Sequence, residues 1–169
     1  RQALTLLQSW DGCLAADSSA ATVCEFFLSE MCRRVAAAKA PNAVEWVLGK
    51  GFASLVPRTT FSVNRVGHLL RLVREQPSGW FAHPWPAEMA EALIAAIRTL
   101  RQHYGPHPGR WTWGQVRPLT LRHPLGARSP LHRIFNLGPF PWGGAANTIN
   151  QAASDPADPR HAGGAGYNA

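Results

Sequence analysis

The chain has 169 residues, 46% of them hydrophobic, and its formal net charge is +7. This length and hydrophobic content suit one packed domain, or part of a larger one, and exclude an intrinsically disordered chain. No stretch of about 20 consecutive apolar residues is present, so the sequence predicts no membrane-spanning helix.

The positive charge is unbalanced in the second half of the chain. No Asp or Glu lies between Glu91 and Asp155, although arginine recurs throughout this stretch. Such an excess predicts an anionic partner, which is either nucleic acid or a set of carboxylates elsewhere in a larger polypeptide. The arginines form neither a run nor a stripe interleaved with aromatic residues, which favours the second interpretation.

Glycine and proline divide the chain into two segments. Residues 1–105 contain few of them and are expected to be mainly helical, whereas residues 106–169 are rich in both and are expected to hold short strands between turns. We therefore predict a helix-rich α+β fold, with both segments forming one fragment of a larger domain.

Two helices are predicted in the first forty residues. Residues 1–10 form a short helix with its leucines (Leu4, Leu6 and Leu7) inward, closed by Asp11-Gly12. Ser18 or Ser19 caps the next helix, because a serine oxygen accepts the free N–H groups of a first turn. This helix ends at Pro41. Its apolar face is predicted to be Val23, Phe26, Phe27, Met31 and Val35.

Three further helices follow. Asn42 is predicted to cap a short one that ends at Gly49, and residues 62–74 form another. The most regular helix starts at Pro86, which suits a first turn because its missing N–H has no partner there, and ends at Gly105-Pro106. The apolar faces predicted for the last two are Val66, Leu69, Leu70 and Val73, and then Met89, Ala90, Leu93, Ile94, Ile97 and Leu100.

Short extended segments are predicted after residue 109. Partial alternation indicates one or two strands over 115–122, and residues 134–137 and 148–152 are predicted to be extended as well. The tail, residues 155–169, is rich in Gly, Pro and Asp, and we expect no closing element there. Both ends of the sequence suggest a piece of a longer chain.

No complete catalytic or metal-binding pattern is present among the histidines. His103 and His107 are four residues apart, but Gly105-Pro106 prevents the helix that would place both on one metal ion. Ser129 and His132 lack a nearby carboxylate to orient the imidazole in a catalytic triad.

The remaining reactive side chains also have simple structural interpretations. Glu88 and Glu91 lie in the first turns of a predicted helix, where acidic residues favour the positive end of its dipole. The sequence has an odd number of cysteines, which predicts no disulfide framework. They are Cys13, Cys24 and Cys32, and we interpret them as small buried hydrophobic residues. We expect neither a metal nor a cofactor.

Three segments resemble a known family. They are Trp113-Gly114-Gln115-Val116-Arg117-Pro118-Leu119, His123-Pro124-Leu125-Gly126, and Phe135-Asn136-Leu137-Gly138-Pro139-Phe140-Pro141-Trp142-Gly143-Gly144, followed by Asn147-Thr148-Ile149-Asn150. Their order and spacing resemble the penicillin acylase family of N-terminal-nucleophile amidohydrolases, which also includes acyl-homoserine-lactone and cephalosporin acylases. Weaker similarity at Trp10-Asp11-Gly12 and in the helix from Pro86 extends the resemblance over the whole chain.

The resemblance implies a specific chemistry. In this family a precursor cleaves itself, and the serine exposed at the start of the larger subunit attacks an amide carbonyl, with its own α-amine as the base. Backbone N–H groups and an asparagine stabilise the oxyanion. None of these groups maps onto this sequence, which matches the C-terminal half of the larger subunit, so we expect no catalytic residue in it.

The motif residues are instead expected to be structural. They are Trp113, Gly114, His123, Pro124, Phe135, Asn136, Gly138, Gly143, Gly144, Asn147 and Asn150. The sequence departs from the family at Ala145-Ala146, where relatives commonly have an acidic residue after the two glycines. Any ion pair made from that position is therefore in doubt.

The resemblance further implies a four-layer αββα sandwich with helical additions, and a periplasmic or secreted protein. The expected partners are the rest of the same precursor (the smaller subunit and the N-terminal part of the larger one) and a small amide substrate, penicillin-like or an acyl-homoserine lactone, with no membrane. Two alternatives remain open: a basic nucleic-acid-binding module, and a stand-alone scaffold domain.

Overall fold

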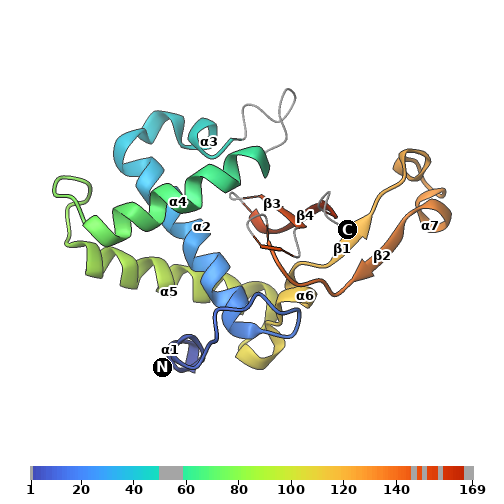
Figure 1. The fold of residues 1–169 in the computed structure, drawn as a ribbon, viewed down its shortest axis with the longest axis horizontal. Helices are drawn as coiled ribbons and strands as arrows, with labels where there is room; N and C mark the ends of the chain where they lie inside the picture. The colour runs from blue at the N-terminus through green and yellow to red at the C-terminus, as the bar shows by residue number, and fades with distance from the viewer. Residues whose placement is uncertain (1, 50–58, 146–147, 150–151, 156–157, 166–169) are drawn as a thin grey trace.

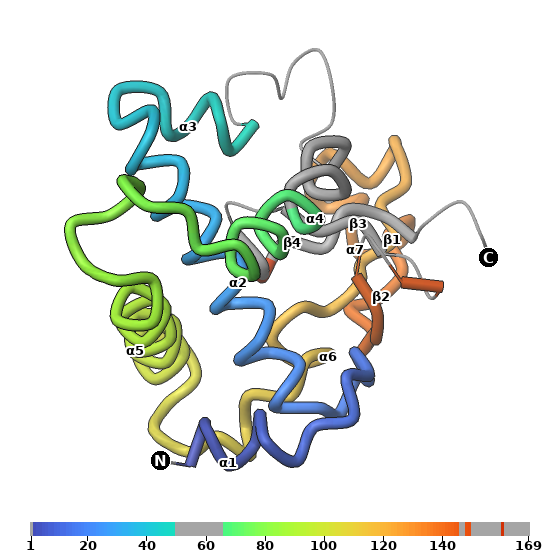
Figure 2. Tube along the Cα trace, turned by 60° about the vertical axis from the view of Figure 1, so that its left-hand side comes forward, coloured from blue at the N-terminus to red at the C-terminus, as the bar shows by residue number. Residues whose placement is uncertain are grey.

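The computed structural model shows a helix-rich α+β fold, as predicted (Figure 1). It describes residues 2–49, 59–145, 148–149, 152–155 and 158–165. The long helices form a body beside which the strands of the second segment lie, as Figures 1 and 2 show from two directions. Among the described helices, none combines the length and the apolar character that a bilayer crossing requires.

Helix α2, Ser19–Lys39, is the centre of this body. The predicted cap is confirmed, because the Ser18 hydroxyl accepts a hydrogen bond from the N–H of Ala21 at 3.1 Å. The predicted apolar face is confirmed at Val23, Phe26 and Met31, which are all buried. Helix α2 therefore contributes side chains to both hydrophobic cores of the body.

Serine 18 provides a direct test of this cap. Replacing Ser18 by alanine leaves the N–H of Ala21 without its acceptor and is expected to destabilise the protein by about 1 kcal/mol. The measurement is the urea midpoint of the full gene product. The matched control is Ser9→Ala, because the exposed Ser9 hydroxyl bonds only carbonyls of the helix that it follows. Equal midpoints for the two variants would contradict the capping role.

Helix α5, Trp85–Tyr104, packs along α2, with Pro86 in its first turn as predicted. Its buried face, however, is Trp85, Glu88, Ala92, Ala96 and Leu100. The prediction that Ile94 faces the core is wrong, because its side chain is 56% exposed. Small alanines at four-residue spacing let α5 approach α2, which turns the bulkier isoleucine outward.

An ion-pair cluster joins α2 to α5. The Arg34 guanidinium bonds Glu30 at 2.8 Å on its own helix and reaches Glu88 and Glu91 on α5. Glu88 is buried, so the two carboxylates that were interpreted as favouring the helix dipole also help to hold the two helices together. Bonds to Arg33 and Arg34 lower the pKa of Glu30 against the opposing effect of its burial.

The other helices differ from the predictions in detail. In α1, Gln2–Gln8, the buried side chain is Ala3, whereas Leu4 is 51% exposed. In α4, Thr59–Glu75, Leu69 and Leu72 face the core and Leu70 is exposed, contrary to the prediction. Both helices are amphipathic, but residues three or four apart share a face and their immediate neighbours do not.

The predicted cap at Asn42 is also wrong. Residues Pro41–Ala43 form a 3-10 turn, in which the N–H of Ala43 bonds the carbonyl of Ala40 at 2.9 Å, and α3 is only Val44–Val47. Because Asn42 lies inside this turn, it does not stand at the start of the helix.

The strands of the described residues form two antiparallel pairs. Strand β1, Leu119–Leu121, pairs with β2, Leu137–Phe140, and β3, Ala152–Asp155, pairs with β4, Asp158–Ala165. Strand β4 also lies against β1. The expectation that nothing closes the tail is therefore wrong, since β4 forms there.

Two predicted extended segments are partly helical. Residues Trp113–Val116 form α6, and His132–Phe135 form α7, whose last N–H groups bond carbonyls four residues earlier. The prediction for 115–122 is confirmed only at β1, and the one for 134–137 only where β2 begins. Of the predicted strand 148–152, Thr148 and Ile149 are not in a strand, residues 150–151 lie outside the described part, and Ala152 opens β3.

Candidate functional site

Four family-motif residues and Arg117 meet at one buried junction beside the start of α2. We name this cluster the Trp113 junction; it consists of Trp113, Gly114, Arg117, Gly143 and Gly144. The indole N–H of Trp113 donates to the carbonyl of Gly144 at 2.8 Å, and no part of the Trp113 residue is exposed. The junction thus joins two motifs that are 31 residues apart.

Backbone hydrogen bonds fasten the junction to the segment before α2. The N–H groups of Trp113 and Gly114 donate to the carbonyls of Ser18 and Ala16, at 3.1 and 2.7 Å. The N–H of Gly144 donates to Leu14 at 2.6 Å. These bonds satisfy buried backbone groups, and they explain why residues 113–116 are helical rather than extended: tertiary partners determine the local conformation.

The glycines of the junction are close to other backbone atoms. A Cβ on Gly114 would lie 2.9 Å from the Cβ of Pro141, and one on Gly143 would lie 2.7 Å from the carbonyl oxygen of Leu14. Both separations are shorter than real Cβ contacts. Glycine is therefore needed at these two positions for close approach.

Arg117 brings a charge into this junction. The Arg117 residue is fully buried, and one guanidinium nitrogen donates to the Gly144 carbonyl at 3.0 Å. The guanidinium lies 5.0 Å from the centre of the Trp113 ring. Burial lowers the pKa of Arg117 to about 10, while nearby Glu25 on α2 opposes that shift. Burial also shifts the pKa of Glu25, in this case upward, and the positive charge of Arg117 opposes that rise.

In the sequence, Arg117 lies within the first family-like segment, but it was counted with the arginine excess and not among the expected structural residues. The signal that distinguishes it is its position four residues after the motif tryptophan, which places it beside that side chain at the end of α6. Glu25, the acidic residue whose charge acts on Arg117, lies on a predicted core helix and belongs to no motif. No local pattern in the sequence connects the two residues.

The other motif residues lie on the β1–β2 hairpin. The side-chain oxygen of Asn136 accepts from the N–H of His123 at 3.0 Å, and its amide nitrogen donates to the carbonyl of Gly126 at 3.4 Å. The His123 ring stacks on Phe135 at 5.4 Å, and its Nδ1 accepts from the N–H of Leu125. Asn136 therefore bridges the two sides of the hairpin between β1 and β2.

The structure also places the remaining motif residues. Pro124 starts a 3-10 turn, Pro124–Ala127, and Gly138 lies in β2 with a φ of +106°. Asn147 and Asn150 lie outside the described residues. The described motif residues thus form two groups, and the polar atoms of Asn136 and the Nδ1 of His123 are engaged with the backbone.

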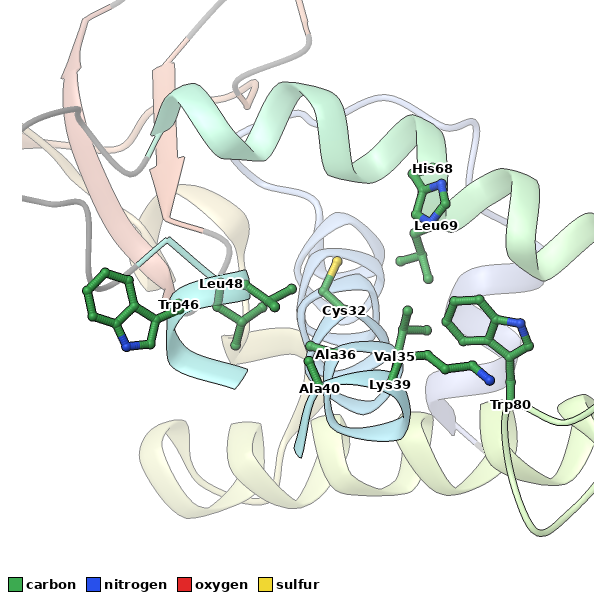
Figure 3. A pocket seen from close by; sticks show the side chains of 11 residues that line it. Cys32, Val35, Ala36, Lys39, Ala40, Trp46, Leu48, His68, Leu69 and Trp80 are labelled. Atoms are coloured by element: carbon green, nitrogen blue, oxygen red, sulfur yellow. The ribbon is translucent and has the colours of Figure 1, made fainter. Parts of the chain in front are cut away.

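The described residues also line a pocket of about 520 Å³ between α2, α3 and α4 (Figure 3). Its lining is mostly apolar and contains none of the motif residues. Lys39, at its wall, donates to the carbonyl of Gly79 at 2.9 Å and lies 4.9 Å from the centre of the Trp80 ring. The cysteines also lie outside the motifs, and none of Cys13, Cys24 and Cys32 is in a disulfide. The prediction that they are buried is wrong at Cys13, which is exposed, while burial raises the pKa of Cys24 to about 11.

Metal ligands do not gather in the part of the chain that the structure describes: no group of three His, Cys, Asp or Glu side chains is positioned to hold an ion there. The two motif groups consist mainly of aromatic, amide and glycine residues, together with Arg117 and His123, and most of their polar atoms bond to backbone. This arrangement can fix the path of the chain.

Comparison with known proteins identifies the family. No curated protein matches the chain significantly. The sequence model of the family described as penicillin amidase matches residues 1–169, which include both motif groups. Because this match covers the whole of the sequence, the chain belongs to the penicillin amidase family.

Proposed function

We propose that this chain is a scaffold segment of an amidohydrolase that cleaves the amide bond of an N-acyl substrate, either penicillin-like or an acyl-homoserine lactone. The observation that carries the proposal is the family match over residues 1–169. In the family, a serine at the start of the larger subunit attacks the carbonyl and its α-amine serves as the base. An α-amine titrates near neutrality, so one residue supplies both groups.

The segment's own contribution is positional in this proposal. The Trp113 junction and the Asn136 bridge hold two parts of the chain by hydrogen bonds to backbone. Residues 1–105 and 106–169 together form one fragment of an αββα sandwich, and the nucleophile comes from the rest of the precursor. The family relationship also supports a periplasmic or secreted enzyme.

The test uses the full-length gene product. Intact masses and N-terminal sequencing are expected to show two chains, the larger one starting at serine and containing residues 1–169. That preparation is expected to release free amine from a penicillin or from an N-acyl-homoserine lactone, and replacement of the exposed serine by alanine is expected to abolish the release. A single uncleaved chain without amidase activity would overturn the proposal.

A further inference from the structure

The hairpin that carries the Asn136 bridge exposes an unusual amount of apolar surface. We name residues 119–140 the arm; it extends away from the helices, with α7 near its far end (Figure 1). Its exposed large apolar side chains are Leu121, Leu125, Ile134, Phe135, Leu137 and Phe140. Ile134 is the most exposed of them, at 71%. Exposed large apolar side chains gathered on one hairpin are typical of an interaction site.

The arm has a defined conformation despite this exposure. The Asn136 amide bonds both His123 and Gly126, and the ring of His123 stacks on Phe135. Strand pairing aligns Leu119 with Phe140 and Leu121 with Leu137. A preorganised arm loses little conformational entropy on binding, which suits it to a specific partner.

The charge of the arm indicates the chemistry of that partner. Arg122, Arg128 and Arg133 are all exposed, and none of them forms an ion pair within the described residues. The sequence has no Asp or Glu from residue 92 to residue 154. Any carboxylate that pairs with these arginines therefore lies outside this stretch.

Both faces of strand β2 are uncovered, whereas β1 is buried at Leu119 and lies against β4. All four residues of β2, Leu137–Phe140, are exposed, and successive strand residues point to opposite faces. A bilayer surface covers only one side of a hairpin that lies on it, and nucleic acid offers phosphates rather than aliphatic contacts. A protein groove covers both faces and contacts aliphatic side chains.

We propose that the arm inserts into a protein groove that is apolar at its centre and rich in Asp and Glu at its rim, and that this groove belongs to the remainder of the same precursor. The apolar side chains fill the centre, and Arg122, Arg128 and Arg133 pair with the rim. The identity of the partner as the same precursor rests on the proposed function, whereas the chemistry of the groove rests on the arm alone.

Photo-cross-linking of the full-length gene product tests the docking. A benzophenone amino acid is placed at Ile134 and, as a matched control, at Ile94, the exposed isoleucine of α5. The probe at Ile134 is expected to capture a peptide of the same precursor from outside residues 1–169, with Asp or Glu within a few residues of the cross-link. The control is expected not to capture that peptide.

Charge reversal supplies an independent readout. The double variant Arg128→Glu/Arg133→Glu is expected to raise the rate of proteolytic cleavage within the arm at least about tenfold. Arg98→Glu/Arg101→Glu makes the same change of charge at exposed positions of α5 and is expected to leave that rate unchanged. Equal rates for the two double variants would contradict pairing between the arm and an acidic rim.

The outcomes separate this inference from the proposed function. Cross-linking at Ile134 to a second copy, to nucleic acid or to lipid, or to nothing, would overturn the docking even if the protein is self-cleaved and active. The expected cross-link in a protein that lacks amidase activity would support the docking and remove the enzymatic proposal.

Discussion

Replacing Arg117 by methionine is expected to destabilise the protein by about 1–3 kcal/mol at pH 8, because the ionised carboxylate of Glu25 loses the nearby positive charge that favours it. The Gly144 carbonyl also loses one of its two side-chain donors and keeps only the indole of Trp113. The measurement is the free energy of unfolding in urea, taken for the full gene product at pH 8 and at pH 4.

The sign of the pH dependence follows from Glu25. Its pKa is raised in the folded protein, so the folded state binds more protons than the unfolded state, and stability falls as the pH rises above the ordinary value of 4.5. Removing Arg117 raises this pKa further, which makes the loss of stability larger at pH 8 than at pH 4.

The double variant Arg117→Met/Glu25→Gln is the control, because it removes both charges at once. It is expected to recover most of the stability that Arg117→Met loses at pH 8, since the neutral amide at position 25 needs no nearby positive charge. A double variant as unstable as the single one, or a loss that is the same at both pH values, would show that the charge of Glu25 is not involved.

Replacing Gly138 by alanine is expected to destabilise the protein by roughly 3 kcal/mol, through backbone strain and a collision. Gly138 has a φ of +106°, and a Cβ there would lie 2.6 Å from the carbonyl oxygen of Leu119 on the paired strand. The measurement is the thermal midpoint of the full gene product, with hydrogen exchange of the β1 and β2 amides to locate the change.

Gly67 provides the matched control for that substitution. It lies inside α4, is exposed and has no heavy atom within 4 Å of an added Cβ. Gly67→Ala is expected to stabilise the protein by up to about 1 kcal/mol, because alanine favours a helix interior. Similar midpoints for Gly138→Ala and Gly67→Ala would contradict the strain at Gly138.

The helices that the sequence predicted best are those with a clear local start and end. Ser18 and Pro41 bound α2, and Pro86 and Gly105 bound α5, because capping and proline chemistry act over a few residues. The face of α5 was harder to predict. Ile94 and Ala96 are both apolar, and only the close packing against α2 decides that the alanine is inside.

Prediction of the candidate site from the sequence was limited in the same way. Motif spacing identified Trp113, Asn136 and Gly144, but it did not predict that Trp113 bonds Gly144 or that Asn136 bridges the hairpin. Those contacts depend on loops that close over many residues, and local periodicity carries no information about them. Gln115 and Val116 were wrongly predicted to be extended for the same reason, since carbonyls near residue 16 determine the helical turn Trp113–Val116.

The Trp113 junction has a consequence for how the protein is made. Leu14, Ala16 and Ser18 find their backbone partners at residues 113–144, so the segment before α2 cannot be fully fixed in place until Gly144 has left the ribosome. Synthesis at about 5–20 residues per second delays this step by seconds, while α2 and α5 can already pair. The motif Gly143-Gly144 therefore closes the first part of the fold late in synthesis, and a nascent chain stalled before Gly143 is expected to hold a docked pair of helices whose preceding segment is not yet fixed.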